Sequence, residues 1–502
     1  MNFNQILAPQ GALGGFAGSM NQGDIDNLVK AIEATQITGR ETTNVTDASG
    51  APLKLESLAS TLKNLSYRME NLTIWNSINK SQASNTVEEY AQRLNQGGAD
   101  EGGFFAEGQL PESHDTTYTR RAQTIKAMGE VGEVTDMAQM VNTIGSSGLM
   151  AREVRSRTES LLRRVDRSIL LADSAHSPAA WNGLYAQHEK SDNSTYDEGS
   201  EEAYLASPRV IDLRGAALDN KAIANGAKSI VESGSGQPSH CFFDFSTLEA
   251  YRQRYLPNFL TPGSVQNTDA GVGNNLMSQI TAYGKIGFKG NIFMAPKGFL
   301  NPAVVGATSP KAPIAIVPDA TTPVASVATN GAASKFSADD AGAYSYAIRP
   351  FNNYGFGPLT ILGSATIAAG EVASLKFAYA TGVNSATAFE IYRTKSGESG
   401  SGKYYPIFRL TATQVANSYN GATAGTVSDL NWYLPGTSQG FMLDGSVDTF
   451  DFRQLGSLYK FNIARTAPVD RFALMLYGTP IMANNKRFVR FINIGLDTVP
   501  TP

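Results

Sequence analysis

Residues 96–133, QGGADEGGFFAEGQLPESHDTTYTRRAQTIKAMGEVGE, form the most unusual stretch of this 502-residue chain. The stretch begins with glycines and then alternates around Tyr118–Met128, with the period of two that is typical of extended chain. Neither face of this alternation is clearly apolar. We therefore predict a long β-ribbon that needs neighbouring chains to cover it, because an isolated ribbon is only marginally stable in water.

Helices are expected on both sides of this ribbon. The pattern turns helical from Leu53 to Leu94, and a separate helix is predicted over Thr86–Leu94 because Thr86 is a good cap followed by two glutamates. After the ribbon, Thr135 and Asp136 can cap another helix. A longer helix is predicted over Leu149–Ala175 from an apolar stripe with helical spacing. The stripe consists of Met150, Val154, Leu161, Val165 and Ile169.

The flanking regions indicate an arm and a mixed body. Residues 1–50 are rich in glycine and small polar residues, which is typical of an N-terminal arm that becomes ordered against something else. From 176 to 310 strands and helices alternate, as in an α+β body. The predicted elements there are a helix from Asp219 to Ile230, a strand over Ser239–Phe245, a helix over Ser246–Tyr255 and two strands within Ile280–Met294.

Residues 311–435 have a different texture, since charge falls and helical periodicity disappears. Six short apolar runs at turn-like spacing predict a small β-sandwich. The runs are Val324–Ala328, Tyr344–Pro350, Val372–Ala378, Phe389–Thr394, Tyr404–Leu410 and Trp432–Leu434. Beyond them the α+β texture returns and ends in a predicted strand pair, Phe472–Tyr477 with Arg487–Ile494. We therefore predict one body, 51–310 plus 436–502, with an all-β sandwich inserted at 311–435.

Composition narrows the class of protein. At ~150 residues per domain, the length suggests about three domains. Charged residues make up only 17% and there are 48 glycines, which indicates a turn-rich protein whose surface is partly buried against other molecules. Lys and Arg number 41 against 45 Asp and Glu, which is too balanced for a protein that grips nucleic acid. The N-terminal residues do not resemble a signal peptide, and no apolar run approaches the ~18 residues of a membrane span.

No motif for catalysis or for a cofactor emerges. The run Gly397–Lys403 nearly spells a phosphate-binding loop, but Tyr404 replaces the required Ser or Thr and the flanks predict a strand hairpin. The single cysteine, Cys241, is expected to be a buried hydrophobe. Scattered histidines and carboxylates complete the candidates, namely His114, His176, His188, His240, Glu107, Glu112 and Asp115. We expect no catalytic, cofactor or metal site and no enzymatic activity.

Several short stretches follow one another in a distinctive order. They are Phe104–Glu107 with Pro111, Asp115, Tyr118, Arg120 and Ile125–Lys126, then Glu133–Thr135, then Trp181–Leu184. Arranged as arm, extended loop, long helix, mixed body and final strands, the chain resembles the major capsid protein of tailed bacteriophages. That fold is shared with encapsulins and with the floor of herpesvirus capsids. In this resemblance the three stretches correspond to the extension loop, the entry to the helices and the turn after the spine helix.

The predicted insert carries a second resemblance. Ala341–Arg349, Asn352–Pro358 and Ala388–Arg393 are similar to immunoglobulin-like or fibronectin type III repeats of phage structural proteins. Such domains often decorate the outside of capsids.

The capsid resemblance implies a function, a location and a set of partners. The chain would self-assemble into hexamers and pentamers of an icosahedral shell that encloses double-stranded DNA, without sequence-specific DNA binding and without a membrane. Portal, scaffold and decoration proteins are the other implied partners, and the location would be the virion, after synthesis in the bacterial cytoplasm. Candidate subunit-interface residues are Phe104, Phe105, Glu107, Tyr118, Arg120, Arg121 and Lys126. Phe104 and Phe105 are the expected anchors, because the extended loop cannot bury them within one subunit.

Two alternatives remain open from the residues. A phage tail or baseplate structural protein would also suit the β-sandwich, although the arm, loop and helix order argues against it. A carbohydrate-binding surface protein would act through aromatic residues of the insert, namely Tyr344, Tyr346, Phe351, Tyr354 and Phe356. Tyr344 and Tyr346 alternate along a predicted strand, which favours a place in the sandwich core.

Overall fold

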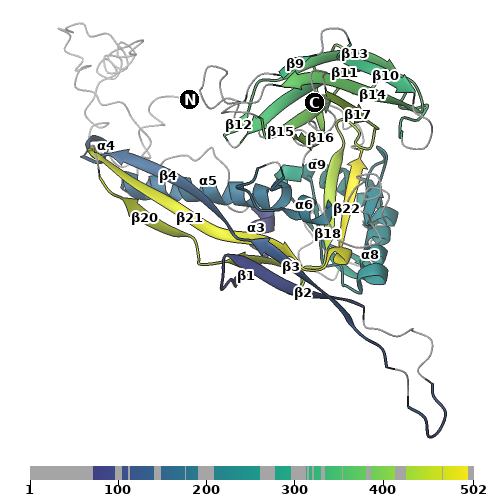
Figure 1. Ribbon diagram of the computed structural model, residues 1–502, viewed down its shortest axis with the longest axis horizontal. Helices are drawn as coiled ribbons and strands as arrows, with labels where there is room; N and C mark the ends of the chain where they lie inside the picture. Colours follow the sequence, from purple (N-terminus) through teal and green to yellow (C-terminus); the bar gives the residue numbers. More distant parts are fainter. Residues whose placement is uncertain are drawn as a thin grey trace, which may run out of the picture. The chain divides into compact units, whose positions relative to one another are not determined.

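The computed structural model describes the chain from Leu72 to Gly495 with several gaps (Figure 1). The described residues are 72–95, 104–110, 113–140, 148–175, 177–189, 209–259, 278–294, 313, 316–318, 322–328, 334–352, 354–379, 386–412, 425–465 and 467–495. The predicted arm at 1–50 and the helix predicted around the leucines at 53–62 lie outside these residues. Within the described residues, no helix combines the length and the apolar character that crossing a membrane requires.

A five-stranded sheet is built around one long strand, β21 (Val469–Met482). β4 (Lys126–Thr135) pairs antiparallel with it along one side, and β19 (Phe450–Gln454) and β20 (Tyr459–Ile463) pair with its two halves on the other. β1 (Asn79–Gln82) completes the sheet beside β19. In β4 the residues alternate between buried and exposed, so one face of the strand points into the protein and the other does not.

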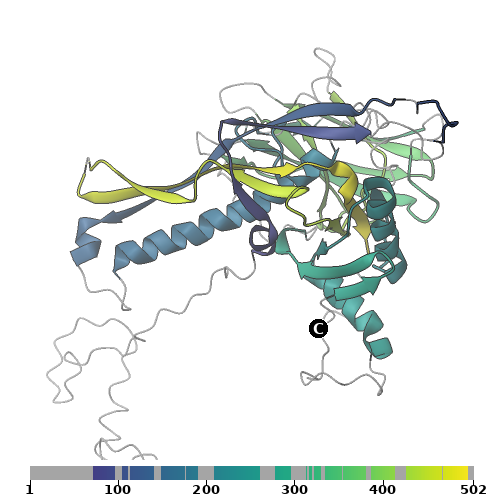
Figure 2. The ribbon, with the colours of Figure 1, turned by 90° about the horizontal axis from the view of Figure 1, so that it is seen from below.

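The predicted long helix is present as α5 (Leu149–Leu171), which runs alongside β4 (Figure 2). It ends about one turn before the predicted Ala175. The second half of its apolar stripe is buried as expected, with Leu161, Val165 and Ile169 inaccessible to solvent, whereas Met150 and Val154 are half-buried. Two short helices flank this region, α3 (Thr73–Ser77) and α4 (Asp136–Met140), and α6 (Leu184–Glu189) follows the turn after α5.

A six-stranded mixed sheet forms the second part of the body. Its order is β5 (Val210–Asp212), β22 (Phe488–Ile494), β18 (Ser438–Leu443), β6 (His240–Phe243), β8 (Gly284–Gly290) and β7 (Ser278–Thr281). The helices α8 (Asn220–Gly234) and α9 (Phe245–Phe259) pack their apolar residues into the same core. Asp219 caps α8 as predicted, and Cys241 is buried in β6. The short 3₁₀ turns η3 (Ile292–Met294) and η4 (Asn485–Arg487) follow β8 and precede β22.

The predicted C-terminal strand pair is wrong in one respect. Both strands exist, as β21 and β22, but β21 belongs to the five-stranded sheet and β22 to the six-stranded sheet. The residues between them therefore carry the chain from one sheet to the other. A turn between two strands does not by itself fix their pairing, because each strand here finds better-matched partners elsewhere in the chain.

The ribbon predicted around Tyr118–Met128 is confirmed, and it corrects the helix predicted over Thr86–Leu94. β2 (Val87–Asn95) pairs antiparallel with β3 (Thr117–Thr124), and the chain continues through Ile125 into β4. Thr86 and the two glutamates after it satisfy the local pattern of a helix start. Cross-strand pairing outweighs that local preference, and Glu89 forms an ion pair of 3.2 Å with Arg120 on the opposite strand.

Two sheets between residues 316 and 429 bury one common hydrophobic cluster. The first contains β9 (Ile316–Pro318), β10 (Val324–Ala328), β14 (Glu371–Tyr379) and β17 (Gly425–Asp429). The second contains β11 (Gly342–Asn352), β12 (Gly355–Phe356), β13 (Thr360–Ile367), β15 (Ala388–Arg393) and β16 (Tyr405–Thr411). Phe377 of the first sheet and Phe389 of the second meet with ring centroids 5.5 Å apart.

Five of the six strands predicted in this segment are confirmed, and the run Trp432–Leu434 is not a strand. The last strand is β17, which has few large apolar residues and gave little signal. Trp432 and Tyr433 instead pack against Val210 and Ile492 of the six-stranded sheet. The apolar run Trp432–Leu434 therefore packs against the body at the point where the chain leaves this segment.

Candidate functional site

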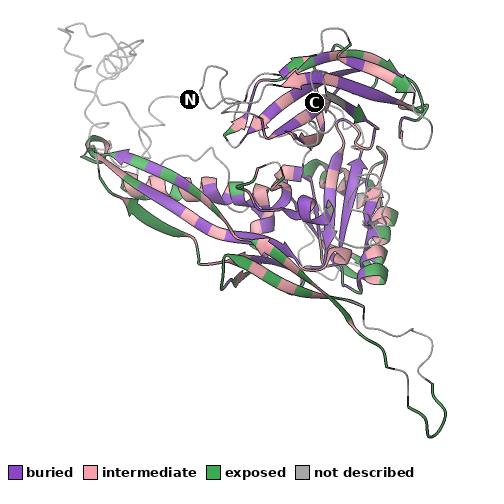
Figure 3. Cartoon of the chain, viewed as in Figure 1, coloured by how far each residue is buried: buried purple, intermediate pink, exposed green. Residues whose placement is uncertain are grey.

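The tip of the ribbon presents large apolar side chains to solvent. Phe104 is 100% exposed, Phe105 58% and Leu110 92%, and all seven residues of 104–110 are exposed (Figure 3). Glu107 lies in the same exposed segment. Side chains of this size are costly to leave in water, so the tip has the character of a surface that another molecule covers.

The strands of the ribbon have two different faces. Tyr118 (65% exposed) and Arg120 lie on the outer face of β3, where Arg120 pairs with Glu89. Arg121 lies on the other face and donates a hydrogen bond of 2.7 Å from Nε to the side-chain oxygen of Gln92. Gln92 in turn donates to the main-chain carbonyl of Ala483. Arg121 therefore helps to attach the ribbon to its own body, and of the three predicted interface residues on β3, Tyr118 and Arg120 lie on the outer face.

The base of the ribbon is part of the body. Lys126 opens β4, pairs with Gly478 of β21 and donates a hydrogen bond of 3.0 Å to the carbonyl of Pro178. Glu88 lies 3.7 Å from Arg453, which also contacts Asp451 at 3.0 Å. The seven predicted interface residues are thus spread along the ribbon from tip to base, and the structure does not gather them into one cluster.

A second exposed apolar surface was missed from the sequence. On the outer face of the five-stranded sheet, Val131 (56% exposed) and Phe461 (42%) flank Ala473 in register, and Tyr459 (44%) lies opposite Met475. The alternation of Tyr459, Phe461 and Ile463 was the available signal. At the end of this face, Met137 and Met140 of α4 are 79% and 85% exposed.

Metal binding finds no support among the described residues. No group of three or more His, Cys, Asp or Glu side chains that could hold a metal ion occurs among them. His188 is fully buried; burial and the nearby Arg209 lower its pKa to about 3, so the neutral ring donates to the carbonyl of Phe488 at 3.1 Å. Burial raises the pKa of the Cys241 thiol, which makes it inert. Glu107, Asp115 and His114 are exposed on the loop.

The glycine-rich run 397–403 is a hairpin loop, as predicted. It connects β15 and β16, which pair antiparallel, so the element that directly follows it is a strand and not the helix that a phosphate-binding loop requires. Gly397, Gly400 and Gly402 all have positive φ angles of 73–79°, which explains why glycines recur there.

The sequence matches the family described as SU10 major capsid protein over residues 36–312, which is more than half of the chain. The chain belongs to the SU10 major capsid protein family. This capsid protein is therefore a structural subunit of an icosahedral phage shell, located in the virion, and not an enzyme. The tail or baseplate alternative is accordingly wrong. The β2–β3 ribbon and α5 both lie within the matched range.

Comparison with other proteins adds a few distant likenesses. No curated protein matches the capsid protein. Among solved structures, the SrpI encapsulin complex of Synechococcus elongatus PCC 7942 is 6% identical, with a TM-score of 0.40 over 92% of this chain and 99% of that one. The capsid of a native GTA particle is 8% identical (TM-score 0.42, 90% and 99%), and Mycobacterium phage Adephagia is 8% identical (0.41, 91% and 100%).

Proposed function

We propose that this capsid protein assembles into hexamers and pentamers around double-stranded DNA, and that the ribbon tip and the outer face of the five-stranded sheet are its subunit contacts. The observation that carries the proposal is the exposure of Phe104, Phe105 and Leu110 at the tip of a ribbon that has no core of its own. Portal, scaffold and decoration proteins are further proposed partners. The near-neutral composition, with a net charge of -4, suits a shell that contains its genome without gripping it.

The exposed aromatic side chains of the tip would stabilise a subunit contact that buries them. Burying one phenylalanine side chain stabilises a contact by about 2 kcal/mol. Phe104 and Phe105 together thus supply on the order of 4 kcal/mol to each contact, before the cost of ordering the loop. A shell repeats each contact many times, so modest individual contacts are sufficient for assembly.

We also propose that residues 311–435 are an immunoglobulin-like or fibronectin type III-like β-sandwich inserted into the capsid body. Three observations support this. Two sheets share a cluster whose fully buried members all lie between Ile316 and Val427. The family match ends at residue 312, next to the predicted boundary. The chain on both sides of the segment belongs to the same body, since β18 follows the segment and pairs with β6, which precedes it.

The aromatic residues of this domain give little support to carbohydrate binding. Tyr344 and Tyr346 are buried in the cluster, and the Tyr346 hydroxyl donates to Asp429 at 2.9 Å. Phe356 is also buried, beside Phe351. Tyr354, 59% exposed, is the one member of the five that is largely open to solvent. A binding platform needs several exposed rings together, which these residues do not provide.

The contact role of the tip can be tested by replacing both phenylalanines. In the Phe104→Ser, Phe105→Ser double variant we expect the subunit concentration needed for assembly to rise at least about tenfold, because two apolar anchors are lost. Thermal unfolding of the unassembled chain should not change, since both side chains are exposed in it. Sedimentation of a concentration series measures the assembly concentration, and circular dichroism of the unassembled chain on heating measures its thermal unfolding.

Tyr354→Ser is the matched control, because it removes an aromatic ring of similar exposure from the inserted domain. We expect it to assemble like the parent chain. Unchanged assembly of the double variant, or equal loss in the control, would overturn the assignment of the tip as a subunit contact.

A further inference from the structure

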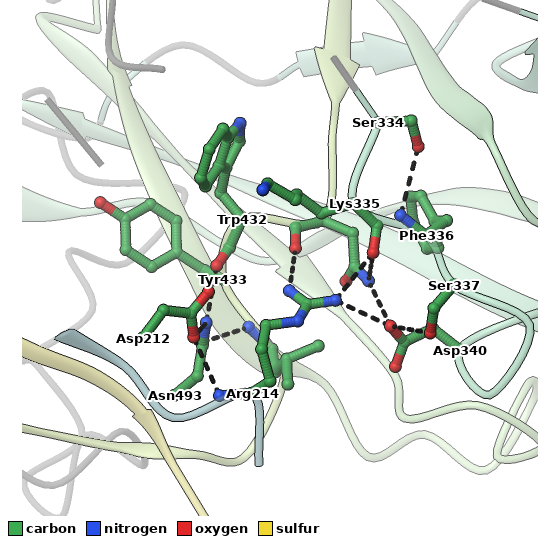
Figure 4. Close-up of polar contacts among 12 residues, drawn as sticks. Asp212, Arg214, Ser334, Lys335, Phe336, Ser337, Asp340, Trp432, Tyr433 and Asn493 are labelled. Carbon is green, nitrogen blue, oxygen red and sulfur yellow. Dashed lines mark hydrogen bonds and ion pairs between the residues drawn. The ribbon is translucent and has the colours of Figure 1, made fainter. Parts of the chain in front are cut away.

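One arginine of the body contacts two separate parts of the inserted domain (Figure 4). Arg214 follows β5, and its Nη1 donates to the carbonyl of Asn431 at 2.8 Å. Its Nη2 donates to the carbonyl of Lys335 at 2.7 Å and to the Asp340 carboxylate at 2.8 Å. Asn431 lies where the chain leaves the domain, whereas 335 and 340 lie in the loop between β10 and β11. One guanidinium thus bridges a loop and the exit of the domain.

We propose that Arg214 is a clamp that mounts the inserted domain rigidly on the capsid body. The proposal rests on the insertion proposed above. The Arg214 contacts would hold the domain in one orientation relative to the body in every subunit of the shell. A domain joined to the body by flexible linkers alone would have no fixed orientation.

The body holds Arg214 and the exit segment in place from its own side. Asp212 accepts hydrogen bonds from the main-chain N–H of Arg214 at 2.9 Å and from the Asn493 amide at 2.7 Å. The same Asn493 amide nitrogen donates to the carbonyl of Trp432 at 2.8 Å, and its oxygen accepts from the N–H of Leu434 at 2.8 Å. Asn493 is 1% exposed, so these bonds are shielded from water.

The domain holds Asn431 from the opposite side. Arg393, which is fully buried, donates to Asp429 at 2.6 Å and to the side-chain oxygen of Asn431 at 2.6 Å. The Asn431 amide donates to Asp340 at 3.1 Å and to the Lys335 carbonyl at 3.3 Å. A continuous series of hydrogen bonds therefore links the core of the domain to the six-stranded sheet. Cooperative networks of this kind resist hinge motion better than isolated surface pairs.

Unusual backbone conformations also occur at this junction between the body and the inserted domain. Of the four described non-glycine residues with positive φ, three belong to this network: Arg214 (46°), Asn431 (60°) and Asn493 (55°). Asparagine tolerates this left-handed conformation better than most residues, whereas for an arginine it is unfavourable and persists where the surroundings impose it. The conformation of Arg214 therefore indicates that the contacts at the junction hold its backbone against its local preference.

Hydrogen–deuterium exchange of the full-length chain tests the clamp directly. The informative segments are 334–341 and 430–436, where the N–H of Lys335 is bonded to the carbonyl of Leu430 at 2.8 Å. In Arg214→Ala we expect exchange in both segments to become about tenfold faster, with β14 and β15 still protected. In Arg214→Lys, which keeps the charge but cannot reach all three acceptors, we expect an intermediate rate.

Arg252→Ala is the matched control, because it removes an arginine whose ion pair with Glu249 lies on the surface of α9. It should leave both segments unchanged. The clamp is refuted if exchange at 334–341 and 430–436 does not respond to Arg214→Ala, or if β14 and β15 lose protection equally. The readout needs no assembly, so it is independent of the subunit contacts proposed above.

A distance measurement tests the rigid mounting itself. Cys241 is buried and is the single cysteine of the sequence, so spin labels at Lys228→Cys on the body and Lys403→Cys on the domain will be specific. In unassembled chain we expect one narrow distance distribution, which broadens when Arg214→Ala is added. A broad distribution in the parent chain would contradict rigid mounting.

Discussion

At the scale of single residues, Asp166 is the buried group with the clearest consequence. It lies on α5, is fully buried, and accepts hydrogen bonds from the N–H of Trp75 at 2.7 Å and from the Asn291 amide at 3.0 Å. It thereby joins α5 to α3 and to the turn after β8. Burial raises the pKa of Asp166 to about 6, although the hydrogen bonds from Trp75 and Asn291 act in the opposite direction.

This raised pKa predicts a pH dependence of stability. Between about pH 4 and pH 6 the folded chain binds the Asp166 proton more tightly than the unfolded chain does. The contribution of Asp166 to the free energy of unfolding therefore falls as the pH rises through this window. Relative to the parent, Asp166→Asn should gain on the order of 2 kcal/mol from pH 4 to pH 7. Urea unfolding of both unassembled chains at the two pH values measures the difference. Parallel pH profiles would show that Asp166 does not titrate in this range.

At the scale of elements, the turn after α5 shows why a specific glycine is required. The N–H of Gly183 donates to the carbonyl of Ala172 at 2.7 Å, and the Trp181 indole donates to the carbonyl of Ser168 at 3.2 Å. A Cβ at position 183 would lie 2.8 Å from the carbonyl oxygens of Ser168 and Ile169. The chain therefore packs against the end of α5 at a separation that only glycine allows.

Gly183→Ala should consequently destabilise the unassembled chain by about 2–4 kcal/mol, because main-chain atoms of the helix cannot move aside. The urea midpoint, or the soluble yield if the variant does not fold, provides the measurement. Gly456→Ala serves as the control, since nothing lies within 4 Å of the added Cβ there. Equal midpoints for the two variants would contradict this explanation of the turn.

The sequence predicted helices and strands correctly where the local pattern of apolar and capping residues is sufficient to determine them. The stripe of α5, the cap at Asp219 and the alternation around Tyr118 gave the correct elements. The helix predicted over Thr86–Leu94 was wrong because β2 is stabilised by a partner about thirty residues later, which a local pattern does not contain. β21 and β22 were correctly predicted as strands, but their pairing with each other was wrong for the same reason.

At the scale of the whole molecule, the exposed ribbon tip was predictable and the junction was not. Two adjacent phenylalanines in a glycine-rich loop predict, from the sequence alone, large apolar side chains that their own subunit does not bury. The Arg214 network assembles residues from positions 212–214, 335–340, 429–434 and 493, and each is unremarkable among its neighbours in sequence. The outer face of the five-stranded sheet was missed because its strands come from three separate parts of the chain.

The insertion model predicts that the capsid body assembles without the inserted domain. From the sequence, deletion of 311–435 would leave assembly intact, because an inserted domain carries its own core. The structure moves the second boundary, since Trp432 and Leu434 are bonded to Asn493 of the body. Deleting 316–430 with a short glycine–serine linker should therefore give shells of the parent diameter in electron micrographs. A deletion variant that stays folded but never assembles would contradict the insertion model.

The central claim, that this chain builds a closed shell through its own contacts, is tested most directly by negative-stain electron microscopy of the purified full-length protein together with its sedimentation profile. We expect closed shells or flat sheets of hexamers. Long tubes of fixed lumen, or a folded chain that stays monomeric over the whole concentration series, would be incompatible with this claim.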